Sequence, residues 1–363
     1  MREHPATAPG HNKGVNHAER PHGRAIEHMP TMFQRPDRIT QPLDVILTVF
    51  NNARWRSRWK LYEDFVRHAE AQGEAVRVWT VEVIFGQREA AVTDPMNHRH
   101  LQLYTTSELW HKERSQNLLV QRVVQFHPDA EYFAFVDADV TFARSDWADE
   151  TRHALQHYDV VQMWRDGYDL DGAGNIIQRN KSFAACRSSG ETLIGADAAQ
   201  HYYYGGQGSQ KDVVYWHPGY AWAWRRSALE AVGGLIDTPI LGSADFHMAY
   251  ALIGRLDLTL NPTLTDGYTR PMRLWQERAY HALKHNVGCL EGSLLHAWHG
   301  PKAQRRYKDR WKILEQTRFD PTFDLSIDTQ GLYKFVHHGA PKHDELRDLC
   351  RNYFFERDED APR

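Results

Sequence analysis

The chain has few cysteines and no long apolar run. Three cysteines, at positions 186, 289 and 350, are spread over 363 residues, and no Cys-x-x-Cys pair occurs. This spacing indicates neither a disulfide framework nor a zinc ribbon, and it favours a reducing compartment. No apolar stretch approaches the roughly 18 residues of a membrane-spanning helix, and the N-terminal residues lack the apolar core of a signal peptide. We therefore expect a cytoplasmic protein without a membrane partner.

The chain also lacks a marked excess of either acidic or basic residues. The formal net charge is -3, which gives no overall attraction to nucleic acid or membrane. Hydrophobic residues make up 41% of the chain, including 12 Trp, 16 Tyr and 15 Phe, which is enough for a large core. Residues 1–41 are rich in His, Pro and Arg, and we expect a disordered or loosely packed basic tail there. We expect one main domain over 42–320 and an extension over 321–363.

Strand and helix patterns alternate in the first half of the chain. Short aromatic and β-branched runs predict strands at 43–50, 76–85 and 132–136. Apolar residues at helical spacing predict one helix after Trp55 and another that opens near Ser107 as N-cap. This order predicts right-handed crossovers and a parallel sheet with helices on both faces, an α/β fold. Residues 166–212 lose the pattern and are expected to form a long irregular loop.

The third predicted strand runs directly into Asp137-Ala138-Asp139. The carboxyl ends of parallel strands are where open α/β folds bind ligands. Two carboxylates at such an end can hold a hard divalent cation and, through it, phosphates. Away from a strand end, Asp-x-Asp is more often a solvated turn.

A second motif, His296-Ala297-Trp298-His299, follows the apolar residues Leu294 and Leu295. An imidazole from this block could complete the ligands of the same cation, and mixed carboxylate and imidazole ligation suits Mn²⁺ better than Mg²⁺. The rival interpretations are a zinc pair and a histidine packed among aromatic residues. The helical His-Glu-x-x-His pattern of zinc proteases is absent from this block.

Two further segments carry candidate functional groups. Asp245 follows a Gly-Ser turn at a predicted helix start, where it could serve as an N-cap or as a general base. Lys112 and Asn117 lie on the helix before the Asp-x-Asp strand and could reach a nucleotide. The alternative for that helix is an exposed charged face.

Together these motifs resemble those of the GT-A fold glycosyltransferases, metal-dependent enzymes that use nucleotide sugars. The resemblance covers residues 43–310, and Lys112-Glu113-x-x-x-Asn117 before the Asp-x-Asp strand is similar to bacterial and phage family 2 members. It implies a Rossmann-like, mixed but mostly parallel sheet flanked by helices. It also implies sugar transfer from a nucleotide sugar, expected to be a UDP-sugar, with Mn²⁺ or Mg²⁺ as cofactor.

The resemblance assigns roles to single residues, in which the two aspartates differ. Asp139 would be a direct metal ligand, and Asp137 would contact the ribose or the metal shell. His299 matches the metal-binding second histidine of the polypeptide N-acetylgalactosaminyltransferases. Asp245 matches the acidic turn of the galactosyltransferases, although one glycine and one acid of that turn are changed here. Candidate contacts to the nucleotide or diphosphate are the strand-end residues Asn51 and Glu82, the helix residues Lys112 and Asn117, and the basic residues Lys302 and Arg306.

The acceptor is less defined than the donor. Trp216 and Trp222 could stack on a sugar or a base. Some phage relatives are thought to glycosylate hydroxymethylated DNA bases, so a glycan and modified DNA are both open as acceptors. A nucleotidyltransferase and a non-catalytic carbohydrate or nucleic-acid binding module are the alternative functions. The oligomeric state, the donor sugar and the stereochemical course are open as well.

Overall fold

The computed structural model describes residues 39–190, 215–301, 309–336 and 341–360. All of them belong to one compact unit that starts at Ile39. The predicted tail therefore lies outside the described residues, apart from positions 39–41. Among the described residues, no helix has both the length and the apolarity that crossing a membrane requires.

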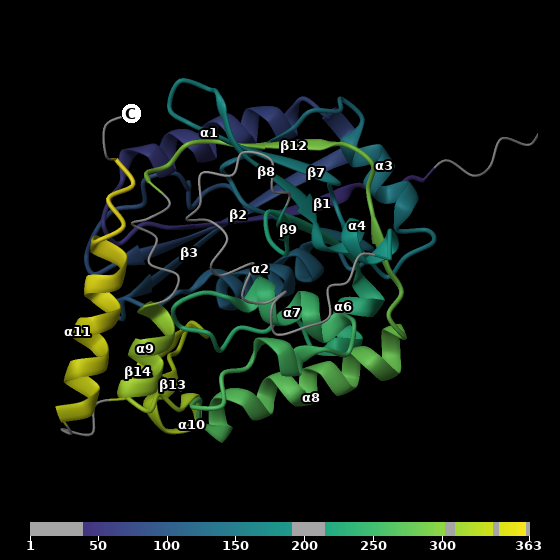
Figure 1. Cartoon of the computed structure of the whole chain (residues 1–363). Coiled ribbons are helices and arrows are strands. Elements are labelled where there is room, and N and C mark those ends of the chain that lie inside the picture. Colours follow the sequence, from purple (N-terminus) through teal and green to yellow (C-terminus); the bar gives the residue numbers. More distant parts are fainter. Residues whose placement is uncertain (1–38, 191–214, 302–308, 337–340, 361–363) are drawn as a thin grey trace, which may run out of the picture. The chain divides into compact units, whose positions relative to one another are not determined.

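A seven-stranded sheet forms the centre of this unit (Figure 1). Its spatial order is β11-β6-β10-β4-β1-β2-β3, and β10 runs antiparallel to both neighbours while every other pair is parallel. The predicted mixed, mostly parallel sheet is therefore confirmed. The strands are β1 (Leu43–Phe50), β2 (Val76–Phe85), β3 (His100–Thr105), β4 (Tyr132–Val136), β6 (Val160–Gln162), β10 (Ala221–Arg225) and β11 (Val287–Cys289).

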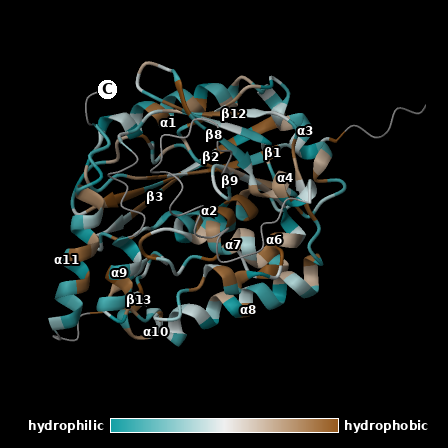
Figure 2. Cartoon of the chain, in the orientation of Figure 1, coloured by the Kyte–Doolittle hydropathy of each residue, from teal (hydrophilic) through white to brown (hydrophobic). Residues whose placement is uncertain are grey.

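Both faces of this sheet are covered. Along β1, Ile46 packs into one apolar core with residues of α2 (Lys112–Phe126) and α8 (Asp266–Leu283). Val45 and Leu47 pack into a second core with residues of α1 (Arg56–Glu70) and α3 (Trp147–Ala154). A strand buried on both sides reads as a continuous apolar run, which explains why β1, β2 and β4 match their predicted bounds. Apolar and polar residues are mixed along the covering helices (Figure 2). These are α1 (Arg56–Glu70), α2 (Lys112–Phe126), α3 (Trp147–Ala154), α6 (Arg226–Val232), α7 (Ala244–Leu252) and α8 (Asp266–Leu283), with the short 3-10 turns η1 (Gly73–Ala75) and η3 (Leu256–Thr259).

A second, five-stranded sheet occupies part of the segment expected to be irregular. Its order is β5-β12-β7-β8-β9, with β5 (Val140–Phe142), β7 (Asp166–Leu170), β8 (Ile176–Ser182), β9 (Tyr215–His217) and β12 (Ser293–His296). The predicted loop over 166–212 is thus wrong for 166–188, where β7 and β8 pair and α4 (Phe183–Ser188) follows. Asp171 closes the hairpin by accepting hydrogen bonds from the backbone of Ala173 and Asn175, both at 2.8 Å. Residues 191–214 lie outside the described part.

The start of α2 also differs from the prediction. The helix begins at Lys112 with His111 as N-cap, and not near Ser107. The backbone N–H of Trp110 donates to Ile240 O at 2.8 Å, and the His111 ring contacts Ser107 O at 2.8 Å. One local and one tertiary contact thus hold residues 106–111 out of the helix.

The segment after 320 belongs to the same compact unit and is not a separate extension. Leu346, Cys350 and Phe354 of α11 lie in the core that also contains β2 and α8 residues. This part contains α10 (Pro321–Asp324), the hairpin β13 (Leu325–Ile327) and β14 (Tyr333–Phe335), and α11 (Pro341–Phe355), and it follows α9 (Asp309–Gln316).

Candidate metal centre and adjoining pocket

The Asp-x-Asp motif lies between the two sheets. β4 of the large sheet ends at Val136, and β5 of the small sheet begins at Val140. The backbone N–H of Asp137 donates to Tyr220 O at 2.8 Å, and Asp139 O accepts the N–H of Ala297 at the same distance. The turn is therefore anchored on both sides, to the start of β10 and to the end of β12.

Three side chains converge at this turn: Asp139, His296 and His299. The Nε2 atom of His299 lies 3.1 Å from Asp139 Oδ2 and 3.2 Å from His296 Nε2, and His296 Nε2 lies 3.7 Å from Asp139 Oδ1. Ligand atoms about 2.1 Å from a common cation lie about 3.0–3.5 Å apart at octahedral or tetrahedral angles. The three residues thus form a group that could hold a metal ion.

The donor set fits a divalent cation. Both imidazoles turn a ring nitrogen toward the same point, and Asp139 Oδ1 is buried without a hydrogen-bond partner among the described residues. Burial alone would raise the pKa of Asp139, but the two imidazoles beside it hold that pKa well below its ordinary value. A buried oxygen without a partner is costly, and a bound cation would remove the cost. Mixed imidazole and carboxylate ligation is typical of Mn²⁺ and other transition metals rather than Mg²⁺.

A second layer of groups orients His296. Its Nδ1 lies 2.8 Å from Asp169 Oδ1, and the Tyr220 hydroxyl donates to the same carboxylate at 2.6 Å. Burial would lower the pKa of His296, but the carboxylates of Asp139 and Asp169 raise it to about 9. Tyr220 holds this place with φ at 74°, a strained conformation for a non-glycine residue, and stacks on His217 at 4.0 Å between ring centroids. Metal-ligating histidines are commonly held by such a carboxylate.

Asp137 does not join the three ligands. Its carboxylate forms an ion pair with Lys112 at the start of α2. Burial raises the pKa of Asp137, and the Lys112 ammonium opposes that shift. The structure therefore brings Lys112 and Asp137 together beside the metal centre, while the predicted contact of Asp137 with a ribose or with the metal shell stays a prediction.

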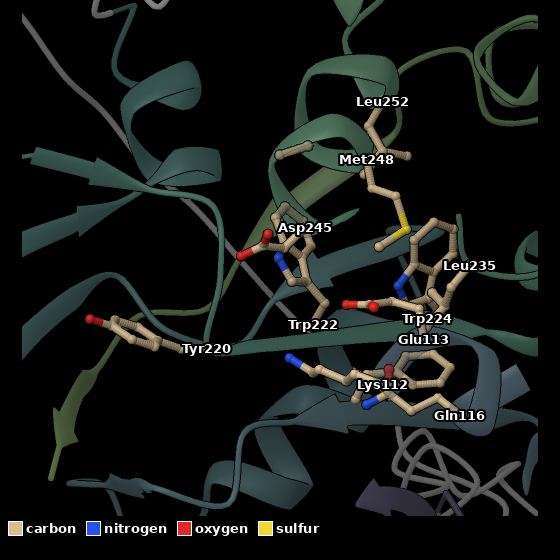
Figure 3. A pocket seen from close by; sticks show the side chains of 12 residues that line it. Lys112, Glu113, Gln116, Tyr220, Trp222, Trp224, Leu235, Asp245, Met248 and Leu252 are labelled. Carbon is tan, nitrogen blue, oxygen red and sulfur yellow. The ribbon is translucent and has the colours of Figure 1, made fainter. Parts of the chain in front are cut away.

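A pocket of about 40 Å³ opens next to this ion pair (Figure 3). Asp245, in the first turn of α7, projects from one side, and Lys112 reaches in from the opposite side. The apolar part of the wall includes Trp222, Trp224 and Met248. Tyr220 connects the pocket to the metal centre, because the residue lines the first and its hydroxyl holds Asp169 in the second. The pocket thus combines a carboxylate, an ammonium group and indole faces.

Other predicted site residues have structural partners. Asn51 bonds to the backbone N–H and carbonyl of Trp55, just before α1, and Glu82 accepts hydrogen bonds from the backbone of residues 91–93. Asn117 bonds to the backbone of Leu235 at 2.9 and 3.0 Å. Their predicted nucleotide contacts stay predictions.

The two tryptophans differ in position. Trp222 lines the pocket and donates its indole N–H to Pro218 O at 2.6 Å. Trp216 packs against Tyr250, with ring centroids 6.3 Å apart, and is not part of the pocket wall. Lys302 and Arg306 lie outside the described residues.

Several residues that lie at the site were not predicted from the sequence. His296 is the first histidine of the His-x-x-His block, so its signal was present, but only the second histidine was assigned as a ligand. Asp169 was hidden in the segment read as a loop. Glu113 and Gln116 line the pocket and are buried, which their place on a polar helix segment did not indicate.

No family model and no curated protein matches the chain. Solved structures with a similar chain path include glucosyl-3-phosphoglycerate synthase from Mycobacterium tuberculosis with Mn²⁺, UDP and phosphoglyceric acid, at 10% identity, 77% coverage of this chain and 76% of that one, and a TM-score of 0.36. The mannosyltransferase PcManGT from Pyrobaculum calidifontis with GDP-Man and Mn²⁺ is 14% identical, with coverages of 77% and 62% and a TM-score of 0.37. S. aureus TarS 1-349 with UDP is 11% identical, with coverages of 86% and 72% and a TM-score of 0.37.

Proposed function

We propose that the protein is a metal-dependent glycosyltransferase of the GT-A type, which moves a sugar from a nucleotide sugar to an acceptor hydroxyl. The observation that carries the proposal is the convergence of Asp139, His296 and His299 at the end of β4, beside a pocket that holds Asp245 and Lys112. A cation site next to a pocket with one carboxylate and one ammonium group suits transfer from a diphosphate donor.

The three ligands would hold Mn²⁺ in preference to Mg²⁺ because two of them are imidazoles. When bound, the metal supplies charge neutralisation for the nucleoside diphosphate as it leaves. Lys112 lies next to the metal centre through its ion pair with Asp137, so its ammonium group can face the same phosphates. UDP is the nucleotide that we expect in the donor.

Asp245 is the candidate general base. Its carboxylate projects into the pocket and lies close to Gly219, on the side opposite Lys112. An acceptor hydroxyl bound against Trp222 would lie within reach of this carboxylate, which would take the proton during in-line attack. In a retaining reaction the same carboxylate would orient the acceptor.

The test is release of UDP from a panel of UDP-sugars with Mn²⁺, in the wild type and in Asp139→Asn. We expect the wild type to release UDP and the variant to lose at least 100-fold in rate, because one charged metal ligand is gone. Asp149→Asn is the matched control, since Asp149 is exposed on α3 and pairs only with Arg152 among the described residues. Absence of UDP release from every UDP-sugar in the wild type would overturn the proposal.

The acceptor requires a second panel. We propose a glycan or a hydroxymethylated DNA base, since the indole face of Trp222 can stack on either. Sugar incorporation from a labelled donor into hydroxymethylated DNA, unmodified DNA and simple glycans separates these acceptors. We place the reaction in the cytoplasm, in keeping with Cys186, Cys289 and Cys350 forming no disulfide among the described residues.

A further inference from the structure

The segment Arg357–Asp360 packs against the metal centre, although it is far from the other ligands in sequence. Asp360 accepts hydrogen bonds from the backbone N–H groups of Arg56 and Ser57 at 2.7 and 2.9 Å, which caps the start of α1. A Cβ built on Gly300, the residue after His299, would lie 2.9 Å from Asp358 O and 3.0 Å from the Cα of Glu359. The segment therefore fits closely between α1 and the end of the His-x-x-His block.

Glu359 is the residue of this segment that faces the metal ligands. Its side chain is 1% exposed, and its Oε2 atom lies 3.7 Å from His299 Nδ1. Arg58 of α1 holds the carboxylate with two contacts of 2.5 and 2.6 Å, and Arg357 adds an ion pair at 3.1 Å. The two arginines fix the carboxylate on the far side of the His299 ring from Asp139.

We propose that Glu359 is a positioning residue that orients His299 for metal binding. The inference rests on the metal centre of the proposed function, but not on the identity of donor or acceptor. A carboxylate beside Nδ1 favours the tautomer with a proton on that atom, which leaves the lone pair of Nε2 for the metal. The distance of 3.7 Å is longer than a hydrogen bond, so the carboxylate acts on the His299 ring through its charge.

The two histidines would then be held in the same way. Asp169 of β7 contacts Nδ1 of His296. Glu359, from the segment Arg357–Asp360, approaches Nδ1 of His299. Loss of such an outer carboxylate typically lowers metal affinity 10- to 100-fold.

The experiment measures Mn²⁺ affinity of the full chain by titration with electron paramagnetic resonance detection. Glu359→Gln keeps the size of the side chain but removes its charge, and we expect a 10- to 100-fold rise in Kd. Glu359→Asp keeps the charge and shortens the reach, so we expect a smaller rise. Asp360→Asn is the matched control: it weakens the cap of α1 but does not touch His299, so thermal stability falls while Kd changes less than twofold.

A spectroscopic readout separates positioning from general destabilisation. Co²⁺ loaded into the same site reports its ligand field by visible absorption. We expect Glu359→Gln to shift this spectrum and Asp360→Asn to leave it unchanged. Equal Mn²⁺ affinity in the wild type and both Glu359 variants, or equal losses in Glu359→Gln and Asp360→Asn, would overturn the inference. Wild type that binds Mn²⁺ but releases no UDP would overturn the proposed function alone.

Discussion

At the scale of single residues, Gly219 sets how closely Asp245 approaches the strand β10. A Cβ at this position would lie 2.7 Å from Asp245 Oδ2 and 2.9 Å from His217 Cε1, distances that real side chains do not reach. We expect Gly219→Ala to displace the Asp245 carboxylate and to lower turnover at least tenfold, because a catalytic group about 1 Å out of place can cost 100-fold. Turnover with Mn²⁺ and a nucleotide sugar measures the effect.

Mn²⁺ affinity is the internal control for Gly219→Ala. The atoms nearest to a Cβ at Gly219 belong to Asp245 and His217 and not to the three candidate metal ligands. The Kd for Mn²⁺ should therefore stay within twofold while turnover falls. Asp245→Asn should reproduce the loss of turnover. Full activity in Gly219→Ala together with a large loss in Asp245→Asn would contradict the steric explanation.

Glu113 gives a prediction for pH dependence. Burial raises the pKa of its carboxyl to about 7, an effect that Lys112 opposes and Asp245 reinforces. Between pH 4.5 and 7 the folded state keeps this proton and the unfolded state releases it, so the stability from this group is complete below pH 4.5 and is lost as pH rises through 7. At about 1.4 kcal/mol per pKa unit, the loss is up to about 3 kcal/mol.

The measurement is urea unfolding of the wild type and Glu113→Gln at pH 5 and pH 7.5, with EDTA present. Glutamine keeps an oxygen that can accept the Trp110 indole N–H, now 2.9 Å from Glu113, but it does not titrate. We expect the wild type to lose more stability than the variant between the two pH values. Parallel pH profiles would show that Glu113 stays ionised in the folded state.

At the scale of elements, the start of α7 combines strain with a hydrogen bond. Ser243 is its N-cap with φ at 88°, a conformation that costs a non-glycine residue about 1–2 kcal/mol, and its hydroxyl accepts a hydrogen bond from Arg310. Ser243→Ala loses the hydrogen bond and keeps the strain, whereas Ser243→Gly loses the bond and relieves the strain. We expect the alanine variant to be about 1 kcal/mol less stable than the glycine variant by urea unfolding. The reverse order would indicate that the strain at this turn is negligible.

Strands with both faces buried could be predicted from the sequence. The strand β7, which carries a residue of the candidate site, could not. β4 is apolar throughout, and β1 and β2 are mostly β-branched and aromatic residues, so their bounds followed from the sequence. β7 carries Asp169, which is 1% exposed and holds His296, and a buried carboxylate breaks the apolar alternation that marks a strand. The polar character of β7 thus comes with the buried contact between Asp169 and His296, and this is why the segment looked irregular.

At the scale of the whole molecule, the metal centre joins parts of the chain that are far apart in sequence. Asp139 follows a strand of the large sheet, His296 ends a strand of the small sheet, and Glu359 comes from the segment that caps α1. The sequence predicted Asp139 and His299 as ligands because both lie in recognisable motifs. It did not predict Asp169 or Glu359, because their approach depends on how strands and helices pack in three dimensions.

Because the ligands come from both sheets, metal binding should stabilise the fold as a whole. A ligand that binds only the folded state at 100 times its Kd adds about 2.7 kcal/mol, which corresponds to a rise of several degrees in Tm. We expect Mn²⁺ to raise the Tm of the wild type by this amount, EDTA to reverse the rise, and Asp139→Asn to show none. Mg²⁺ at the same concentration should give a smaller shift, since two of the three ligands are imidazoles. Equal shifts with Mg²⁺ and Mn²⁺ in differential scanning calorimetry would mean that the histidines do not bind the metal.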